Sequence, residues 1–288
     1  MEELYERYKG LLFKLAYQLT GSASDAEDAV QDVFLKMYDV RPERLTEPKA
    51  YLCKMVTNRC LDLLKSARKK REQYFGHWLP EPVLTPNDKL PESVVRGELL
   101  SYAVLVLLER LSPAERAAFV LREAFGFEYS VIAGMIGKTE ANCRKLASRA
   151  KAKMGMSPEE PVRAEAADGE LIRRFLSALE QGNAVTVLSL LYADAAVISD
   201  GGGKVPAAVH PVVSRERVVA FLLGLMRMAS QWEGGARIWL QEINGQTGLV
   251  VRSNAGIAAV ALTHIDNGLI RHLYFVRNPD KLSLKCLW

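Results

Sequence analysis

The stretch LSPAERAAFVLREAFGFEYSVIAGMIGKTEANCRKLASRAKAKM, residues 111–154, decides the fold of the central part of the chain. It opens with Ser112 and Pro113, an N-cap residue followed by proline at the first helical position. Glu115, three residues after Ser112, completes a capping box that predicts the start of a helix. Apolar residues then recur at helical spacing until Phe125-Gly126-Phe127 interrupts the pattern. The opening of the stretch therefore predicts one capped helix.

Two further helices are predicted in the same stretch. Tyr129–Ile136 is a short helix whose small residues allow close packing. Gly137 can adopt the positive φ of a tight turn, and Thr139 can cap a third helix from Glu140 to about Met154. Three helices in this order, with a glycine turn before the last, predict a helix-turn-helix.

The third helix is strongly basic, which predicts contact with DNA. A recognition helix places its N-terminal residues against base edges and its cations against phosphates. Asn142 could pair with adenine and Arg144 with guanine. The alternative is a basic, solvated helix in an ordinary bundle, but the order of cap, small-residue helix, glycine turn and basic helix favours DNA binding. The candidate DNA-contacting residues are Lys138, Thr139, Asn142, Arg144, Lys145 and Arg149.

Composition indicates a globular protein with unevenly distributed charge. The 288 residues are enough for two or three domains, and 49% are hydrophobic while 25% are charged. The net charge of +4 is only mildly basic. Residues 25–32 contain four acids and no base, whereas residues 65–71 contain five bases and no acid. An acidic patch beside basic stretches predicts separate contacts with protein and with nucleic acid.

Cysteine usage and hydropathy exclude several classes of protein. Cys53, Cys60, Cys143 and Cys286 show neither the spacing of a metal site nor that of a disulfide framework. We therefore expect no metal and no other cofactor. The sequence has no signal peptide and no apolar run long enough to span a membrane. These features predict a cytoplasmic protein without membrane contact.

The first segment predicts a helical domain. Apolar residues between Leu4 and Leu19 recur at helical spacing, which indicates the first helix. Ser24 is expected to cap a second helix, with Glu27 as its capping-box partner. A proline-punctuated loop, residues 41–48, leads to a third helix at about residues 49–71.

Two motifs in this segment carry a family resemblance. DAEDAVQDVFLKMY (residues 25–38) and PKAYLCKMVTNRCLDLLKS (residues 48–66) are similar to region 2 of bacterial sigma-70-type factors. With the helix-turn-helix as region 4, the pair resembles an extracytoplasmic-function (ECF) sigma factor, and the resemblance covers residues 1–73 and 99–154. It implies a protein that binds core RNA polymerase and directs promoter-specific initiation without bond chemistry of its own.

The resemblance also implies which surfaces bind. In that family the acidic second helix docks on the coiled coil of the polymerase β′ subunit, and the β subunit is a further partner. The following loop and third helix read the minus-ten promoter element as a melted strand, which needs a base pocket and cations for its backbone. The polymerase-contact candidates are Asp25, Asp28, Gln31, Asp32 and Phe34. The minus-ten candidates are Tyr51, Lys54, Asn58 and Arg59, together with loop 41–48. The alternative for each of these residues is that it lies on an ordinary solvated helix face without a binding role. For Asp62 two roles stay open, a contact with the promoter or an ion pair with Arg59 or Lys65.

The last segment predicts an α+β domain. Helices are expected at residues 170–181, 185–191 and 214–228, a strand after residue 191, and further strands at 236–242, 247–252, 257–263 and 269–276. Asn-Gly pairs at 244–245 and 267–268 are typical of hairpin turns. Helices before an antiparallel meander, with YADAA at residues 192–196, resemble the SnoaL-like, cone-shaped NTF2 fold. That fold implies a pocket between the sheet and the helices.

The expected fold class is therefore multidomain. Two all-α sigma domains, the region 2 helical bundle and the region 4 helix-turn-helix, precede a C-terminal α+β SnoaL/NTF2-like domain. The expected boundaries are region 2 at 1–75, a proline-rich linker at 76–98, region 4 at 99–156, a second linker at 157–167, and the C-terminal domain with its tail at 168–288.

Three short motifs predict how the domains meet. WLPEP (78–82), DGGGK (200–204) and NPDKL (278–282) resemble signatures of a sigma subgroup with a large C-terminal extension. Trp78 and Leu79 are costly to leave in water, and a glycine-rich loop lets a backbone approach closely. We therefore expect the linker to dock at the loop and the tail to reach a different surface. The candidate interdomain residues are Trp78, Leu79, Pro80, Asp200, Gly202, Lys204, Asn278, Pro279, Asp280 and Lys281.

The subgroup resemblance implies a fused regulatory domain that modulates activity within the chain, so no separate anti-sigma protein is required. The alternative is an enzyme, in which a SnoaL-like domain converts a small molecule and is coupled to a DNA-binding module. Its available groups are Asp194, Asp200, His210, His264, Asp266 and His272. Their spacing matches no known catalytic set, so no catalytic residue is predicted.

Overall fold

The computed structural model describes residues 2–37, 46–72, 74–85, 100–156 and 169–284. The segment expected to be region 2 consists of the helices α1 (Glu2–Thr20), α2 (Ala23–Met37) and α3 (Pro48–Glu72). They pack together through fully buried apolar residues such as Leu15, Ala26 and Val56. Residues 41–45 of the predicted minus-ten loop lie outside the described residues.

The start of α2 differs from the prediction. Ser22 caps the helix instead of Ser24, because its hydroxyl accepts a hydrogen bond of 3.1 Å from the amide of Asp25. Ser24 is exposed. The carboxylate of Glu81, from the linker, accepts a hydrogen bond of 2.8 Å from the amide of Ala23. A carboxylate satisfies the free amides at a helix N-terminus and complements the helix dipole. The actual cap thus comes partly from a distant segment, which local sequence patterns do not reveal.

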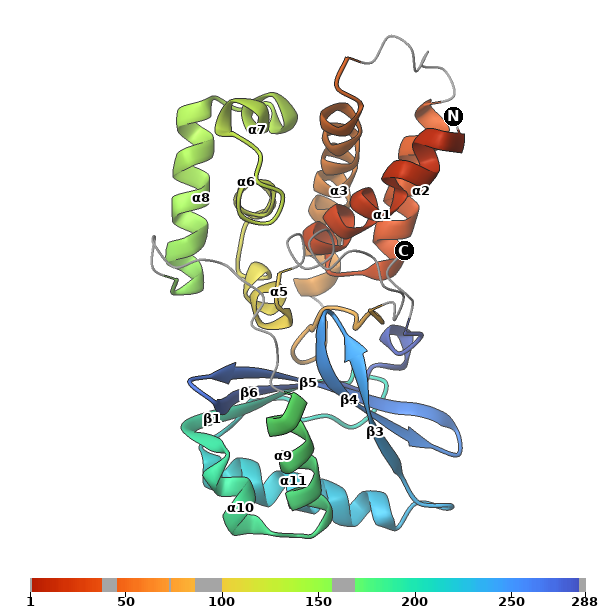
Figure 1. Cartoon of the computed structure of the whole chain (residues 1–288), viewed down its shortest axis with the longest axis vertical. Helices are drawn as coiled ribbons and strands as arrows, with labels where there is room; N and C mark the ends of the chain where they lie inside the picture. Colours follow the sequence, from red (N-terminus) through yellow and green to blue (C-terminus); the bar gives the residue numbers. More distant parts are fainter. Residues whose placement is uncertain (1, 38–45, 73, 86–99, 157–168, 285–288) are drawn as a thin grey trace.

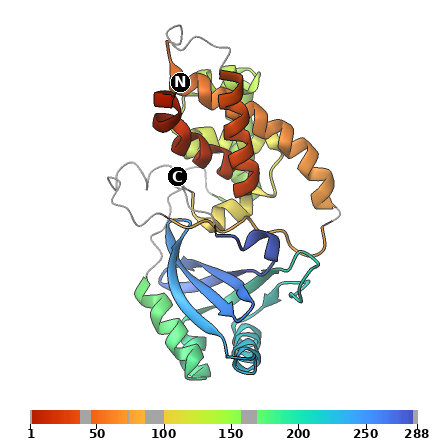
Figure 2. The same cartoon turned by 90° about the vertical axis from the view of Figure 1, so that its right-hand side faces the viewer.

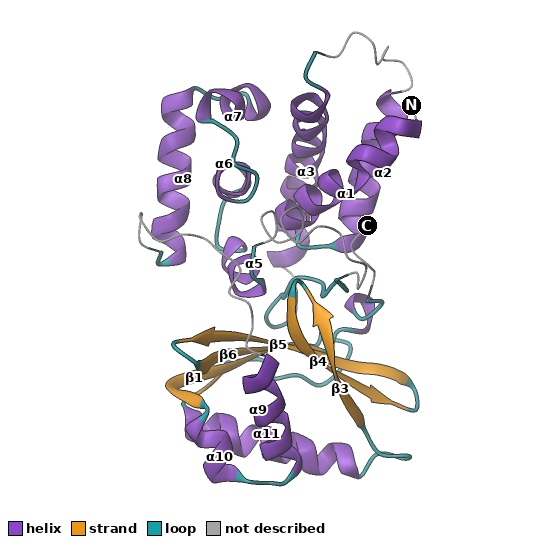
Figure 3. Cartoon of the chain, in the orientation of Figure 1, coloured by secondary structure: helices purple, strands orange, loops and turns teal. Residues whose placement is uncertain are grey.

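Region 4 has the predicted helix-turn-helix (Figure 3). Its helices are α5 (Tyr102–Leu108), α6 (Pro113–Glu123), α7 (Tyr129–Ile136) and α8 (Glu140–Met154). Ser112 and Glu115 form the predicted capping box. Gly137 ends α7 with a φ of 64°, and Thr139 caps α8 by accepting a hydrogen bond from the amide of Asn142.

The C-terminal domain is α+β, as predicted. Its helices are α9 (Gly169–Glu180), α10 (Ala184–Ser189) and α11 (Arg215–Ser230). Its strands are β1 (Leu191–Asp200), β2 (Val212–Val213), β3 (Arg237–Ile243), β4 (Gln246–Ser253), β5 (Gly256–Asp266) and β6 (Leu269–Val276), followed by a short 3-10 helix, η2 (Pro279–Lys281). The sheet order is β2-β1-β6-β5-β4-β3, with β1 parallel to β6 and antiparallel pairing elsewhere. Asn244 and Asn267 have φ values of 54° and 49°, so both predicted hairpin turns are present.

The two faces of the sheet pack against different partners. Side chains alternate along a strand, so Leu273 of β6 joins the core formed with α9 and α11, whereas Tyr274 and Val276 join the core that contains helices α1–α3 and α5–α8. Figures 1 and 2 show α9, α10 and α11 on one side of the sheet and the other helices on the opposite side. The sheet is therefore the layer through which the C-terminal domain meets regions 2 and 4. None of the described helices is both long and apolar enough to cross a membrane.

Candidate polymerase surface, promoter surfaces and interdomain joint

The predicted polymerase surface is the outer face of α2. Asp28 and Gln31 are exposed, and Asp25 and Asp32 are partly exposed. Phe34 is only 6% exposed and packs edge-on against Tyr5, so its side chain supports this face from within the core and does not line it. The structure thus leaves four of the five predicted residues accessible to a partner.

An exposed leucine, Leu35, adjoins this acidic face and was missed from the sequence. Its side chain is 65% exposed. Residues three or four apart are neighbours on a helix surface, which places Leu35 beside Gln31 and Asp32. The helical spacing from Asp28 through Asp32 to Leu35 was the available signal. Leu35 was assigned to neither face of the predicted helix.

The predicted polymerase and minus-ten surfaces meet at one ion pair. The guanidinium of Arg59 on α3 donates to the carboxylate of Asp32 on α2, with 2.6 Å between nitrogen and oxygen. Both side chains are more than a third exposed, so the pair contributes at most about 1 kcal/mol to stability. Asp62, whose role was left open, pairs with Lys65 at 2.9 Å, and this hydrogen bond and charge lower its pKa.

The minus-ten candidates on α3 lie beside region 4. Asn58 and Lys54 are exposed, and Tyr51 is 38% exposed. Tyr51 and Lys54 line a groove of about 460 Å³ whose other wall is α7. The α7 residues in that wall are Val131, Gly134 and Met135. The face expected to read the minus-ten strand is therefore next to the helix-turn-helix.

The recognition helix presents a polar face to solvent. Five of the predicted residues, Lys138, Thr139, Asn142, Lys145 and Arg149, are exposed. Arg144 is exposed too, but its guanidinium pairs with Glu140 and lies 4.7 Å from the ring centre of Tyr129. Buried Cys143, Ala147 and Ala150 form the opposite face of α8. The geometry suits entry of the first turns of α8 into a groove of DNA.

Two lysines of α8 form ion pairs with α6 and help to hold the two helices together. Lys151 pairs with Glu123 at 3.2 Å and Lys153 pairs with Glu115 at 2.7 Å, so both tie α8 to α6. Burial disfavours the Glu115 carboxylate, yet hydrogen bonds from Lys153 and Ser112 outweigh burial and lower its pKa. The positive charge available to DNA on α8 is consequently smaller than the sequence suggests.

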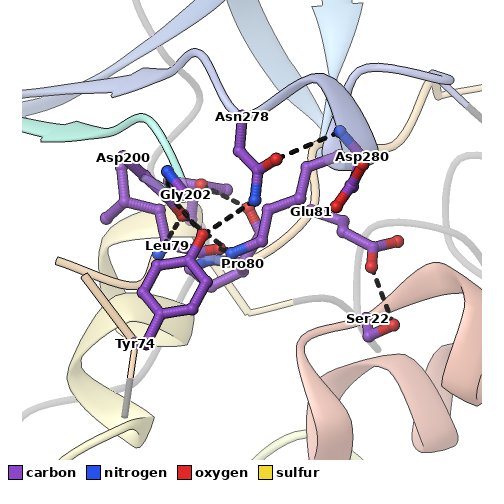
Figure 4. A network of polar contacts seen from close by, with 11 residues as sticks. Ser22, Tyr74, Leu79, Pro80, Glu81, Asp200, Gly202, Asn278 and Asp280 are labelled. Atoms are coloured by element: carbon purple, nitrogen blue, oxygen red, sulfur yellow. Dashed lines mark hydrogen bonds and ion pairs between the residues drawn. The ribbon is translucent and has the colours of Figure 1, made fainter. Parts of the chain in front are cut away.

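A buried polar network, which we call the joint, links the linker to the C-terminal domain (Figure 4). It consists of Tyr74, Leu79, Asp200, Asn278 and Lys281. The fully buried Asp200 carboxylate accepts hydrogen bonds from the Tyr74 hydroxyl at 2.6 Å and from the Leu79 amide at 2.9 Å. Burial and the contact with Asp200 raise the pKa of Tyr74, which keeps its hydroxyl protonated as a donor. The predicted docking of the linker at the glycine-rich loop is therefore present in the structure.

The tail closes the joint, in contrast to the expectation that it reaches a different surface. The Lys281 ammonium lies 2.7 Å from Asp200 and donates to the Leu79 carbonyl at 2.6 Å. It also lies 3.9 Å from the ring centre of Trp78. The Asn278 amide donates to the Tyr74 hydroxyl at 2.8 Å. An isolated buried charge is costly. Asp200 and Lys281 each compensate for the burial of the other's charge.

Exposed contacts border the joint. Lys204 pairs with Asp280 at 2.6 Å, and both side chains are more than half exposed. Pro279 is exposed at the start of η2. These predicted interdomain residues lie together, but they connect the glycine-rich loop to the tail within the C-terminal domain.

The linker also binds region 2 and region 4. Glu81 accepts hydrogen bonds from the Ser22 hydroxyl and the Ala23 amide, both at 2.8 Å, at the start of α2. Its amide donates to the Gly21 carbonyl at 2.9 Å. From region 4, the Tyr102 hydroxyl donates to the Pro80 carbonyl at 2.7 Å. One short segment thus contacts all three parts of the molecule.

A second contact joins the linker to the β3–β4 hairpin. Asn244 exchanges hydrogen bonds with the backbone of Val83, and its amide group donates to the Tyr17 hydroxyl of α1 at 2.7 Å. That hydroxyl donates in turn to the Glu81 carbonyl at 2.6 Å. Burial raises the pKa of Tyr17, so the hydroxyl stays protonated. Sequence reasoning assigned Asn244 only a turn role and missed Tyr17, Tyr74, Glu81 and Tyr102.

The sequence matches known protein families and relatives. Family models match Sigma-70 region 2 over residues 4–70 and Sigma-70, region 4 over residues 101–154. The "ECF RNA polymerase sigma factor SigJ" of Mycobacterium tuberculosis (strain ATCC 25618 / H37Rv) is 35% identical, with 97% of this chain and 92% of the relative covered.

Solved structures are similar as well. The crystal structure of Mycobacterium tuberculosis extracytoplasmic function sigma factor SigJ matches the whole of both chains with a TM-score of 0.81 and 32% identity. An NTF2-like protein from Cytophaga hutchinsonii matches 41% of this chain and 96% of its own, with a TM-score of 0.28 and 15% identity. The chain therefore belongs to the ECF sigma factors, sigma-70-type proteins that bind core RNA polymerase and promoter DNA to direct transcription initiation and are not enzymes.

Proposed function

We propose that the C-terminal domain of this sigma factor holds regions 2 and 4 in a closed state, and that release of the joint frees them to read the promoter. The acidic face of α2 then binds core polymerase, α3 binds the melted minus-ten strand and α8 binds the minus-thirty-five duplex. The joint carries this proposal, because the linker that it anchors also contacts α2 and α5.

The separation of the two promoter elements supports a closed state. Elements centred about 25 base pairs apart lie about 85 Å apart on B-form DNA, at about 3.4 Å per base pair. The groove between Tyr51 of α3 and Val131 of α7 instead places the two DNA-reading regions in contact. The regions must therefore separate before one molecule occupies both elements.

The joint supplies a two-state element for this separation. A ligand or partner shifts such an equilibrium only by its differential affinity for the two states. Core polymerase, which binds the surfaces of the separated regions, favours the open state, whereas the Asp200–Lys281 pair favours the closed one. In this proposal the fused domain takes the place of a separate anti-sigma protein.

Run-off transcription with core polymerase tests the proposal. Lys281→Met keeps the length of the side chain but leaves Asp200 buried without its cation, which costs about 3–5 kcal/mol. We expect more transcript than from wild type when the sigma factor is limiting. Lys204→Met is the matched control, because the exposed pair with Asp280 contributes at most about 1 kcal/mol.

Two outcomes would contradict the closed state. The first is equal transcription from the Lys281→Met variant, the Lys204→Met variant and wild type. The second is a loss of transcription in the Lys281→Met variant while circular dichroism shows the helices of regions 2 and 4 intact. The second outcome would mean that the joint supports the active state.

A further inference from the structure

Arg277 is an unusual cation at the end of β6. Its side chain is half-buried, and burial alone lowers its pKa. Its guanidinium donates to the carbonyl of Pro206. Within the described part of the chain no carboxylate pairs with it. A partly desolvated cation without an anion is costly unless something compensates it.

Arg277 is one of the residues that line an apolar pocket. Arg277 continues the alternation of Leu273 and Phe275, and so points to the face of the sheet that α9 and α11 cover (Figure 1). The pocket holds about 110 Å³, a little less than the apolar cavity of about 150 Å³ that takes up benzene in another protein. Its lining includes Phe175, Leu222, Met226, Trp232, Leu249 and Ala259.

A wider and more open hollow adjoins the pocket. That hollow holds about 500 Å³. It shares Leu179, Met226, Ala229 and Ile238 with the apolar pocket. An elongated molecule can therefore place one end among apolar side chains and extend beyond the pocket.

We propose that this pocket binds a small amphipathic monocarboxylate, with its hydrocarbon part among the apolar side chains and its carboxylate on Arg277. Burial of the hydrocarbon part supplies about 25 cal/mol per Å² of apolar surface. Guanidinium and carboxylate form strong paired hydrogen bonds, which a desolvated site strengthens further. Such a ligand satisfies both unusual features of the site, the cation that pairs with no carboxylate among the described residues and the apolar pocket that it lines.

The site is directly connected to the joint. The backbone amides of Arg277 and Asn278 donate to the Asp200 carbonyl at 2.7 and 2.9 Å. Pro206, the present partner of the guanidinium, follows the glycine-rich loop that contains Gly202. A carboxylate that replaces the Pro206 carbonyl on Arg277 alters the restraint on this loop. That coupling, which rests on the proposed function, makes the carboxylate a signal that biases the closed state.

Calorimetric titration of the full chain tests binding. Octanoate and 3-phenylpropanoate probe aliphatic and aromatic acids, and octan-1-ol and 3-phenylpropan-1-ol are their uncharged counterparts. We expect at least one acid to bind more tightly than its alcohol. Arg277→Gln should weaken binding of that acid about tenfold or more and leave the alcohol unaffected. Arg174→Gln, which changes an exposed arginine of α9, should bind like wild type.

A second variant tests the contribution of the apolar pocket separately from that of the arginine charge. Ala229→Phe fills the space between the pocket and the hollow, so it should abolish binding of acid and alcohol alike. Equal binding of the acid to Arg277→Gln and wild type would overturn the site, as would the absence of heat from both acids at about 1 mM.

Amide hydrogen exchange tests the coupling separately. The acid should change exchange at residues 201–206 and 278–281 in wild type but not in Arg277→Gln. Binding without any such change would overturn the coupling and leave the ligand site standing. Because neither measurement uses transcription, failure of the proposed closed state would not affect them.

Discussion

A Cβ atom placed on Gly202 would lie 2.4 Å from Nδ2 of the Asn278 side chain. Gly202 also has a φ of +62°, which L-residues rarely adopt. We therefore expect Gly202→Ala to move Asn278 away from Tyr74 and weaken the joint. Gly235→Ala is the control, because Gly235 has a φ of +70° and open space around its Cβ position. Its cost should be the conformational one alone, about 1–2 kcal/mol. Thermal unfolding should show a larger drop for Gly202→Ala, and equal drops would mean that the close approach does not matter.

The contribution of α8 to DNA binding can be measured separately from its contribution to packing. Arg149 is exposed, whereas Lys153 is paired with Glu115. We expect Arg149→Ala to weaken binding to all sequences and to reduce the salt slope by about one unit. Lys153→Ala should lower thermal stability and leave the salt slope unchanged. Filter-binding or anisotropy titrations over a salt series measure both, and a reduced slope in Lys153→Ala would reverse the assignment.

Base readout by Arg144 requires that it leave its present partners. Its guanidinium is held by Glu140 and by the ring of Tyr129. If it pairs with guanine, Arg144→Ala should cost about 1–3 kcal/mol at one base position and relax specificity there. Competition binding against single-base variants of the minus-thirty-five element provides the measurement. Uniform weakening across all variants would assign Arg144 to the phosphate backbone instead.

The polymerase surface should include Leu35 as well as the acids. Leu35→Ser removes an exposed apolar side chain, so the fold should tolerate it, while core polymerase binding should fall about tenfold, or about 1.4 kcal/mol. Asp28→Lys should also weaken core polymerase binding, because it reverses a charge on the acidic face. Asp62→Lys is the control, since Asp62 is exposed on α3 and pairs only locally with Lys65. Co-purification with core polymerase distinguishes the variants, and retained binding in both Leu35→Ser and Asp28→Lys would exclude this face.

Stability should fall in mild acid because of a histidine pair between the sheet and α5. The Nδ1 atoms of His264 and His272 lie 3.1 Å apart, which allows one shared proton and disfavours a second. Burial, then His264 and Arg271, lower the pKa of His272, and Arg110 of region 4 adds to this while Asp194 opposes it.

A histidine with a lowered folded pKa stabilises the fold fully above its unfolded pKa of about 6.5, and this contribution is lost as the pH falls through the folded value. The thermal midpoint of wild type should therefore drop between about pH 7 and pH 5. His272→Gln should flatten that dependence, whereas His210→Gln, which changes an exposed histidine, should not. An unchanged slope in His272→Gln would remove the pair from the explanation.

Local patterns predicted most of the elements and several of their caps. The Ser112–Glu115 box, the left-handed Gly137 and both Asn-Gly hairpins depend on neighbouring residues, so the sequence contains their full explanation. The docking of Leu79 at Asp200 was also predictable, because an apolar pair in a proline-rich linker needs a partner.

Long-range partners could not be predicted in the same way. Glu81 caps α2 from 58 positions away. Lys153 is a basic residue of the recognition helix, so the sequence alone suggests that it contacts DNA. The packing of α8 on α6 instead brings it to Glu115. The tail was expected elsewhere because nothing in NPDKL shows that the Lys281 ammonium reaches back to Asp200. Phe34 was expected to contact the polymerase but is buried, while Leu35, which was given no role, is exposed, because one position along a helix decides which side chain is buried.

The spacing of the joint along the chain has a consequence for protein synthesis. Tyr74 and Asn278 are 204 positions apart, and both are needed before Asp200 and Lys281 are enclosed. Domains fold as the chain leaves the ribosome, N-terminal first. Every newly made molecule therefore passes through an interval in which regions 2 and 4 are complete and the joint does not yet exist. If the joint closes these regions as proposed, translation gives free core polymerase a brief window for assembly that ends when the joint forms.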